Sequence, residues 1–277
     1  MRLNRAQRAQ MAQETLRIID EGHYTSPSGQ HVDISAAVAA SVAGTREFPS
    51  GHRVRLPAHL QHRHTTRIVV RNETTLAAAH RLAADHRTIA LNFASAKNPG
   101  GGFLSGSEAQ EESLARASSL YACLDGLPMY YFHQQRSDAL YTDYVIYSPS
   151  VVVFRDDEGK LQETPFTCSF VSSPAPNAGA MLRQDPTRGY EIRQALGSRI
   201  SKVLSVAATQ GYDAMVLGAW GCGVFKNDPE EVAAQFQEAL TDSFAGVFRL
   251  VHFAVLDPSS SGAVIAPFQR AFGSDLS

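Results

Sequence analysis

The sequence predicts an α/β protein in which a mixed or parallel sheet is covered by helices on both faces. Apolar runs alternate with helical patterns from residue 67 onward, and these runs are nearly continuous in hydrophobic residues, as in strands buried on both sides. Two glycine-rich loops each follow such a run and precede a helical pattern. Ligands of such sheets bind beyond the carboxyl ends of the strands, where these loops are expected.

Size and composition fit this class. The chain has 277 residues, of which 44% are hydrophobic and 19% are charged, and its formal net charge is −2. These values predict a full hydrophobic core and exclude a polycation that coats nucleic acid by charge alone. The three cysteines, Cys123, Cys168 and Cys222, lack CxxC spacing, and the amino-terminal residues lack the apolar core of a secretory signal. We therefore expect a cytoplasmic protein without membrane contact.

Residues 1–65 are expected to form an accessory segment packed on a main domain of residues 66–277. The pattern predicts, in order, a helix at 5–21 stopped by Gly22, a hairpin at 24–34, a short helix at 34–42, and irregular chain at 48–64 with a short strand at 54–56. Residues 1–71 hold ten arginines against five acidic residues. This excess indicates either a solvated surface or a face for a polyanionic ligand, and the sequence leaves both open.

The main domain alternates strands and helices. Apolar runs predict strands at 67–71, 88–94, 151–154, 166–172, 214–217 and 249–256. Apolar residues at helical spacing predict helices at 74–86, 107–124, 190–209, 229–244 and 263–272. The helix at 107–124 is expected to begin with a capping box of Ser107 and Gln110, which have the required spacing.

The first glycine-rich loop contains Gly100, Gly101 and Gly102 in succession after the strand at 88–94. Consecutive glycines let backbone N–H groups approach a ligand, and a following helix start adds free N–H groups and a positive dipole end. The pattern matches neither a dinucleotide-binding nor a P-loop fingerprint. By itself the loop is equally consistent with an anion or sugar–phosphate site and with a flexible turn.

The second loop, residues 218–227, reads GAWGCGVFKN. Two such loops at strand ends predict opposite walls of one site for a diphosphate. Phe225 is expected either to stack on a sugar or base or to pack beneath the loop. Trp220 is expected either to contact the ligand or to anchor the loop.

Glu111 and Glu112 follow the first loop near the start of the predicted helix. They either complement the helix dipole or face the ligand held by the glycines. Adjacent helical residues point about 100° apart, so the two cannot easily flank opposite sides of one glycosidic bond. In the functional interpretation, one glutamate acts first as acid and then as base, while the other orients sugar hydroxyls. Burial and a neighbouring carboxylate raise the pKa of such a glutamate once a ligand closes the site.

The motif Asn98-Pro99-Gly100-Gly101-Gly102, a seven-residue spacer and Gln110-Glu111-Glu112 together resemble the signature of poly(ADP-ribose) glycohydrolases, in particular the shorter bacterial-type branch. The loop GAWGCGVFKN is similar to that family's second diphosphate loop, and residues 71–76 are similar to its turn at the adenine end. The resemblance implies a macrodomain: a three-layer α/β/α sandwich with a mixed sheet, here with an N-terminal helical extension. It also implies hydrolysis of the ribose–ribose O-glycosidic bonds of poly(ADP-ribose), with release of ADP-ribose.

The resemblance implies a role for each matching residue. Glu112 would protonate the leaving ribose oxygen and then deprotonate water, and Glu111 would hold ribose hydroxyls. The implied substrate-binding residues are Asn98 at the distal ribose, Gly100, Gly101 and Gly102 at the diphosphate, Gln110, the opposing loop of Gly221, Cys222, Gly223 and Val224, Phe225 on the ribose, and Glu73 or Thr74 near adenine. No metal or cofactor is implied.

The implied partners are poly(ADP-ribose), ADP-ribose and poly-ADP-ribosylated proteins. The protein is expected to be a monomer, to act in the DNA damage response and not to recognise nucleic-acid sequence. Two alternatives stay open: a reader that binds ADP-ribose without cleaving it, and a hydrolase of single ADP-ribose units on proteins. The double glutamate favours the glycohydrolase, because a reader has no need of it. Larger family members carry an aromatic clasp over adenine, for which Tyr130, Tyr131, Phe132 and Tyr144 are candidates, with core packing as their other role.

Overall fold

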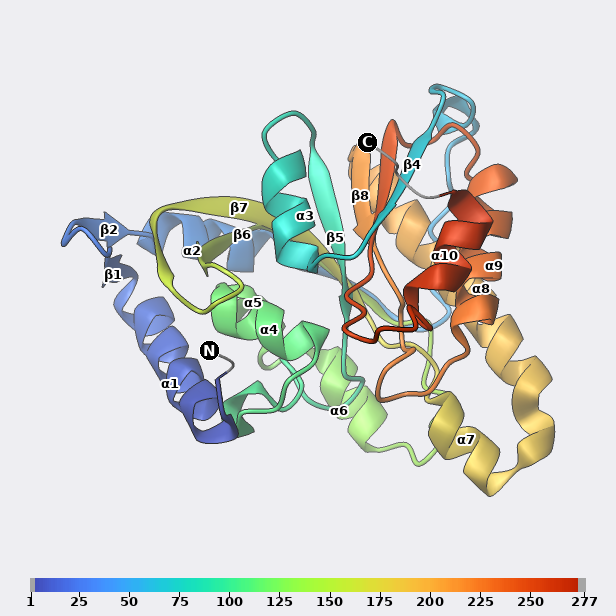
Figure 1. Cartoon of the computed structure of the whole chain (residues 1–277), viewed down its shortest axis with the longest axis horizontal. Helices are drawn as coiled ribbons and strands as arrows, with labels where there is room; N and C mark the ends of the chain where they lie inside the picture. The colour runs from blue at the N-terminus through green and yellow to red at the C-terminus, as the bar shows by residue number, and fades with distance from the viewer. Residues whose placement is uncertain (1–2, 274–277) are drawn as a thin grey trace.

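The computed structural model describes residues 3–273, in which a seven-stranded mixed sheet lies between two layers of helices (Figure 1). The strands follow one another across the sheet in the order β3 (Arg46–Phe48), β6 (Val145–Arg155), β7 (Leu161–Ser173), β5 (Thr88–Phe93), β8 (Ala214–Leu217), β9 (Leu250–Ala254) and β4 (Arg67–Arg71). The five strands from β7 to β4 are parallel, while β6 is antiparallel to both of its neighbours. The carboxyl ends of five strands therefore meet at one edge.

The two helical layers follow from the alternation of side chains along the strands. Ile89 and Leu91 of β5 lie in the core on one face, which is covered by α8 (Gly189–Thr209), α9 (Pro229–Thr241) and α10 (Ile265–Phe272). Ala90 lies in the core on the other face, which is covered by α3 (Thr75–Leu82), α4 (Gln110–Ala117), α5 (Leu120–Leu124) and α6 (Pro128–Gln134). The three-layer α/β/α sandwich with a mixed sheet is confirmed.

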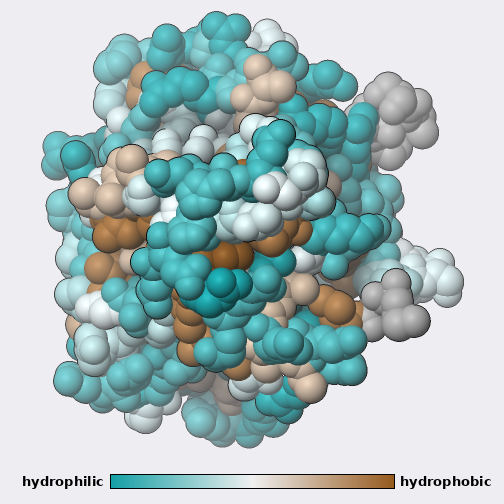
Figure 2. Space-filling model, turned by 90° about the vertical axis from the view of Figure 1, so that its left-hand side faces the viewer, coloured by the Kyte–Doolittle hydropathy of each residue, from teal (hydrophilic) through white to brown (hydrophobic). Residues whose placement is uncertain are grey.

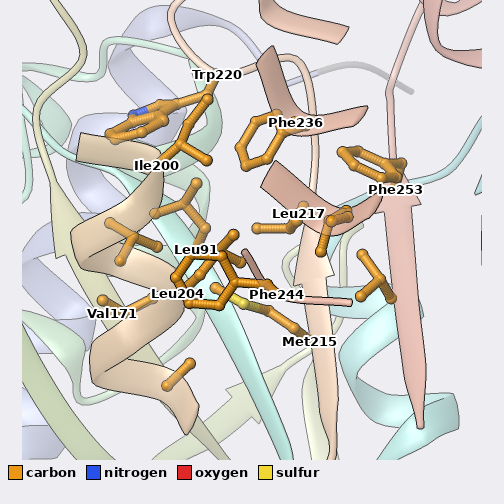
Figure 3. Packing of buried hydrophobic residues seen from close by; sticks show 14 of the residues in the cluster. Leu91, Val171, Ile200, Leu204, Met215, Leu217, Trp220, Phe236, Phe244 and Phe253 are labelled. Atoms are coloured by element: carbon orange, nitrogen blue, oxygen red, sulfur yellow. The ribbon is translucent and has the colours of Figure 1, made fainter. Parts of the chain in front are cut away.

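Figure 3 shows the core on the first of these faces. Trp220 lies beside Ile200 of α8, and Phe236 of α9 packs toward Phe253 of β9. Trp220 is fully buried, and its indole N–H donates to the Ser173 carbonyl at 3.2 Å. Of the two roles considered for Trp220, the structure supports that of an anchor for the second glycine-rich loop.

The amino-terminal segment consists of α1 (Arg5–Glu21), the hairpin of β1 (His23–Thr25) and β2 (His31–Asp33), and α2 (Ser35–Gly44). The helix α2 packs on β6, and Ile18, Tyr24 and Val38 share a core cluster with Val152 and Phe154. The helix α1 packs mainly on the turn at Phe103–Ser105 and on α4. The predicted helices and hairpin are confirmed. The segment also supplies β3, so it is tied to the main sheet by backbone hydrogen bonds as well as by packing.

The predicted single helix at 107–124 is wrong, because α4 ends at Ala117 and α5 begins at Leu120. Ser118 is extended, with φ −146° and ψ 174°, and its hydroxyl donates to the Leu114 carbonyl at 2.7 Å. The Ser119 N–H donates to the Val152 carbonyl at 2.9 Å. The two serines thus pair with the edge of β6 instead of continuing the helix.

The capping box predicted for Ser107 and Gln110 is also wrong. The N-cap of α4 is Ala109, which has no side-chain cap. The Gln110 side chain instead reaches to β5: its amide donates to the Leu91 carbonyl at 2.7 Å, and its oxygen accepts from the Phe93 N–H at 2.9 Å. A tertiary contact has taken the place of the local one.

Other elements differ in extent. The strand predicted at 151–154 is part of the much longer β6, and its partner β7 begins at Leu161 rather than 166. Residues 54–56 form no strand, because Val54 and Leu56 pack against the core beneath α8 and α9 instead of joining the sheet. The strand β3 and the short helices α6 and α7 (Ala178–Gln184) were not predicted.

Among residues 3–273, no helix is both long and apolar enough to cross a membrane. The face seen on the left of Figure 1 is mostly hydrophilic, and hydrophobic residues show there only in small, separated patches (Figure 2).

Candidate active site

A cavity of about 1050 Å³ lies at the carboxyl ends of the parallel strands. Both glycine-rich loops, the start of α3 and the first turn of α4 contribute to its wall, and α1 and the turn between β6 and β7 enclose one side. Among the predicted site residues, the lining set is Glu73, Thr74, Asn98, Gly101, Gly102, Gln110, Glu111, Glu112, Gly221, Cys222, Gly223, Val224 and Phe225. Residues separated by about 150 positions in the chain therefore share one cavity.

The first loop is shaped by glycines in the left-handed region. Gly100 has φ +67° and Gly101 has φ +61°. A Cβ on Gly101 would lie 2.4 Å from Glu112 Oε1, so only glycine allows the loop this close to the carboxylates. Gly100 does not line the cavity: it is buried, and a Cβ there would lie 2.9 Å from the Phe103 ring.

Glu111 is buried at the inner wall, with 4% of its surface exposed. Its Oε2 accepts from the Ser95 N–H at 2.6 Å, and its Oε1 accepts from the Asn92 side-chain amide at 3.4 Å. Burial, with a smaller contribution from the Glu112 charge, raises the pKa of Glu111 to about 8. Glu111 can therefore stay protonated at neutral pH and donate a hydrogen bond.

Glu112 faces the first loop and is more accessible than Glu111. Its Oε1 accepts from the Gly102 N–H at 2.9 Å. The two carboxyl groups have different donors: Glu111 accepts from Ser95 and Asn92, and Glu112 accepts from Gly102. Both carboxyl groups line the cavity, and Glu112 is the more accessible of the two.

The second loop is held in shape by Asn227. The Asn227 side-chain amide donates to the Pro176 carbonyl at 2.8 Å and to the Gly221 carbonyl at 3.2 Å. Gly221 has φ +75°, and a Cβ there would lie 2.3 Å from Asn227 Nδ2. Val224 lies between Gly223 and Phe225 in this loop and is 76% exposed.

Two further side chains of this loop line the cavity. Burial raises the pKa of the Cys222 thiol to about 12, so it remains protonated and unreactive. The ring of Phe225 lies 5.9 Å from that of Tyr141, centroid to centroid, and the Phe225 carbonyl accepts from the Gly179 N–H. The packing and ligand-facing roles considered for Phe225 are therefore compatible with each other.

Glu73 and Thr74 line the cavity at the start of α3. The Glu73 carboxylate is 2.6 Å from His252 Nε2 and 2.5 Å from Arg81 Nη2. Although burial opposes it, these partners hold the pKa of Glu73 below its usual value. The Thr74 hydroxyl donates to Asp157 in the turn between β6 and β7 at 2.6 Å. Both side chains are thus engaged with protein groups.

Sequence reasoning missed Asn92, Ser95 and Asp157. Asn92 is fully buried inside an otherwise apolar strand and donates to Ser172 Oγ at 3.0 Å as well as to Glu111. A polar residue in a buried strand is a signal that could have indicated it. Asp157 gave no such signal, because a turn far along the chain is placed against α3 only by the fold.

Two other sets of residues lie outside the cavity. The candidate aromatic clasp does not line it: Tyr130 and Tyr144 are buried in the core, and Tyr131 is exposed. None of the arginines in residues 46–67 lines it either.

Within the described part of the chain, no group of three or more His, Cys, Asp or Glu side chains is arranged to hold a metal ion, the histidines of residues 59–64 included.

Comparisons with known proteins show the family of this chain. The family model of the microbial-type PARG catalytic domain matches residues 12–156, whereas no curated protein matches the chain. The poly(ADP-ribose) glycohydrolase of Thermomonospora curvata is 47% identical, with TM-score 0.89 over 97% of this chain and 100% of that one. Its complex with the inhibitor ADP-HPD gives 48% identity and TM-score 0.87 over the same shares.

The Deinococcus radiodurans poly(ADP-ribose) glycohydrolase in complex with ADP-ribose is 43% identical, with TM-score 0.80 over 84% of this chain and 96% of that one. The family match spans more than half of the chain, and the structural matches extend the likeness over both glycine-rich loops. By sequence and fold, this chain belongs to the microbial-type poly(ADP-ribose) glycohydrolase family.

Proposed function

We propose that this protein hydrolyses the ribose–ribose O-glycosidic bonds of poly(ADP-ribose) and releases ADP-ribose, with Glu112 as the catalytic acid and base. The observation that carries the proposal is the position of Glu112. Its carboxylate lies in the cavity between two glycine-rich loops and is fixed by the Gly102 N–H at 2.9 Å. A carboxyl group held beside a glycosidic bond is the catalytic element that glycoside hydrolysis requires.

In the proposed reaction, Glu112 gives its proton to the leaving ribose oxygen as the bond to the anomeric carbon breaks. Positive charge then develops on the ribose, and the Glu112 carboxylate that the proton transfer leaves behind stabilises it. Glu112, now ionised, removes a proton from the attacking water, whose oxygen forms the new bond to the anomeric carbon. This step returns the proton to Glu112 and leaves ADP-ribose with a free hydroxyl.

Glu111 is proposed to hold the ribose hydroxyls near the scissile bond. Its raised pKa supports this role, since a neutral carboxyl group can donate to one hydroxyl and accept from another. The Ser95 N–H and the Asn92 amide keep the group in one orientation. Glu111 is thus a rigid partner to the more accessible Glu112.

The loops are proposed to bind the ADP-ribose unit. The loop of residues 221–224 would bind the diphosphate through its backbone, Gly101 and Gly102 would allow the ligand a close approach, and Phe225 would pack on the ribose. Asn98 would contact the distal ribose, and Gln110 would fix the start of α4. Glu73 and Thr74 would lie near adenine. The ADP-ribose and ADP-HPD complexes of the related enzymes support a ligand of this kind.

We extend the proposal to poly-ADP-ribosylated proteins as substrates, a monomeric state, a cytoplasmic location and a role in the DNA damage response. The three free cysteines are consistent with a reducing compartment. Separation by size together with light scattering tests the monomer.

The activity test uses purified poly(ADP-ribose) in the presence of EDTA, with free ADP-ribose measured over time. Parallel reactions contain a protein that carries single ADP-ribose units. Release from the polymer supports the proposal. Release from the singly modified protein alone would replace it with the mono-ADP-ribosyl hydrolase, and ADP-ribose binding without release from either would make the protein a reader.

A further inference from the structure

The amino-terminal edge of the sheet, opposite the candidate active site, carries a row of charged residues. Arg87, Asp213 and Arg249 directly precede β5, β8 and β9, which are neighbours in the sheet. The Asp213 N–H donates to the Arg87 carbonyl at 3.2 Å, and the Arg249 N–H donates to the Asp213 carbonyl at 2.8 Å. Since neighbouring strands lie about 4.8 Å apart, the two arginine backbones are about 10 Å apart.

The segment that leads into β4 adds a third arginine to this edge. The His62 N–H donates to the Ala245 carbonyl at 2.8 Å, and the His64 N–H donates to the Gly246 carbonyl at 3.0 Å. These bonds flank Arg63 and fix its backbone. Arg63, His64, Arg87, Asp213 and Arg249 line a second cavity of about 200 Å³.

Positive charge prevails in this second cavity, because three guanidinium groups face one carboxylate. The Asp213 carboxylate is 3.7 Å from Arg249 Nε, so it offsets part of the positive charge of one of the three arginines. Arg87 lies over the Tyr212 ring, 5.4 Å from its centroid. The pKa of His64 is lowered by burial and, to a smaller extent, by the charges of Arg249 and Arg63, as a positive potential requires.

We propose that this second cavity binds a diphosphate group of poly(ADP-ribose) in units remote from the bond being cleaved. The inference rests on the proposed function. Guanidinium groups bind phosphate oxygens in pairs, and the cavity is smaller than the roughly 300 Å³ at which pockets for whole small-molecule ligands begin. It therefore fits a phosphate or diphosphate group rather than a nucleotide.

Because the two cavities are far apart, only long poly(ADP-ribose) chains can occupy both of them at once. They lie at opposite edges of the sheet, separated by the length of β5, whose six residues span about 20 Å. A single ADP-ribose unit cannot reach both. A longer polymer can, and its second contact is then intramolecular, which increases avidity without altering the chemistry at Glu112.

The binding test fills the active site with saturating ADP-ribose and then titrates pyrophosphate by calorimetry. The wild type and an Arg17→Gln control, which removes an exposed arginine of α1 paired with Glu21, should bind pyrophosphate. The Arg63→Gln/Arg249→Gln double variant should not. Equal binding by the double variant and the wild type, or no binding by the wild type, overturns the inference.

The kinetic test compares a polymer of two units with long chains. In the double variant, KM for long chains should rise about three- to tenfold, while kcat and the KM for the short polymer stay unchanged. If the double variant fails to fold, Arg63→Gln alone repeats the test, since its side chain is exposed. If the wild type cleaves neither the short polymer nor long chains, the proposed function is refuted. If the double variant is active and its KM for long chains equals that of the wild type, only the second site is refuted.

A single-stranded DNA of the same phosphate count is the final comparison. With ADP-ribose in the active site, long poly(ADP-ribose) should bind more tightly than this DNA. Equal or tighter binding of the DNA would reassign the second cavity to nucleic acid and overturn the inference.

Discussion

The backbone N–H of Ser95 donates to Glu111 Oε2 at 2.6 Å, which ties the first turn of α4 to the end of β5. This bond links the loop that carries the three glycines to the helix that carries the glutamates. The Gly102 N–H makes the corresponding bond to Glu112, so each glutamate is held by a different part of the same loop. Preorganised groups of this kind are what electrostatic catalysis requires.

Glu112→Ala is expected to lower turnover of poly(ADP-ribose) by about 10²- to 10⁴-fold, the usual effect of removing a general acid–base group. ADP-ribose binding should persist, since the proposed diphosphate contacts come from the loops. Release of ADP-ribose and calorimetric binding measure the two effects, with Glu21→Ala on α1 as a control outside the cavity. If the Glu112 variant loses folding and binding together, the catalytic assignment has no support.

Glu111→Gln is expected to alter the dependence of stability on pH. The folded pKa of Glu111 is raised from 4.5 to about 8, so the folded state holds a proton that the unfolded state has lost in this interval. The contribution of Glu111 to the free energy of unfolding is therefore complete below about pH 4.5 and falls until about pH 8. Thermal unfolding is measured at pH 5 and pH 8. The unfolding temperature of the variant minus that of the wild type should be greater at pH 8 than at pH 5. A difference that is the same at both values would contradict the raised pKa.

Gly101→Ala is expected to impair both stability and activity. The new Cβ would lie 2.4 Å from Glu112 Oε1, and the φ of +61° is unfavourable for alanine. We expect a loss of about 1–3 kcal/mol of stability and displacement of the Glu112 carboxylate. Gly189→Ala is the matched control, because no heavy atom lies within 4 Å of its Cβ position. Chemical denaturation and initial rates give the comparison, and two equally active variants would remove the steric argument.

Asn227→Ala is expected to loosen the second loop. The variant removes the amide that donates hydrogen bonds to the Pro176 and Gly221 carbonyls. The free energy of unfolding should fall by about 1–3 kcal/mol if these carbonyls stay buried. Affinity for ADP-ribose should fall because residues 221–225 lose their fixed shape. A rise in KM larger than the fall in kcat would identify a binding defect, whereas unchanged KM would show that the loop does not depend on Asn227.

The sequence determined the alternation of strands and helices in the main domain, because apolar runs and helical periodicity are local properties of the chain. It also located both glycine-rich loops and the glutamate pair, since consecutive glycines and adjacent acids are visible without coordinates. The likeness to the bacterial-type family followed from the same motifs. For these features the physical cause lies within about ten neighbouring residues.

Other features were decided by contacts between distant parts of the chain. The break at Ser118 arises from pairing with β6, and the Gln110 side chain serves β5 rather than its own helix. The different environments of Glu111 and Glu112 also come from packing, because burial raises the pKa of Glu111 although Ser95 and Asn92 donate hydrogen bonds to it, while Glu112 is more accessible. Such desolvation depends on which groups surround a carboxylate in space, and only the tertiary structure assembles them.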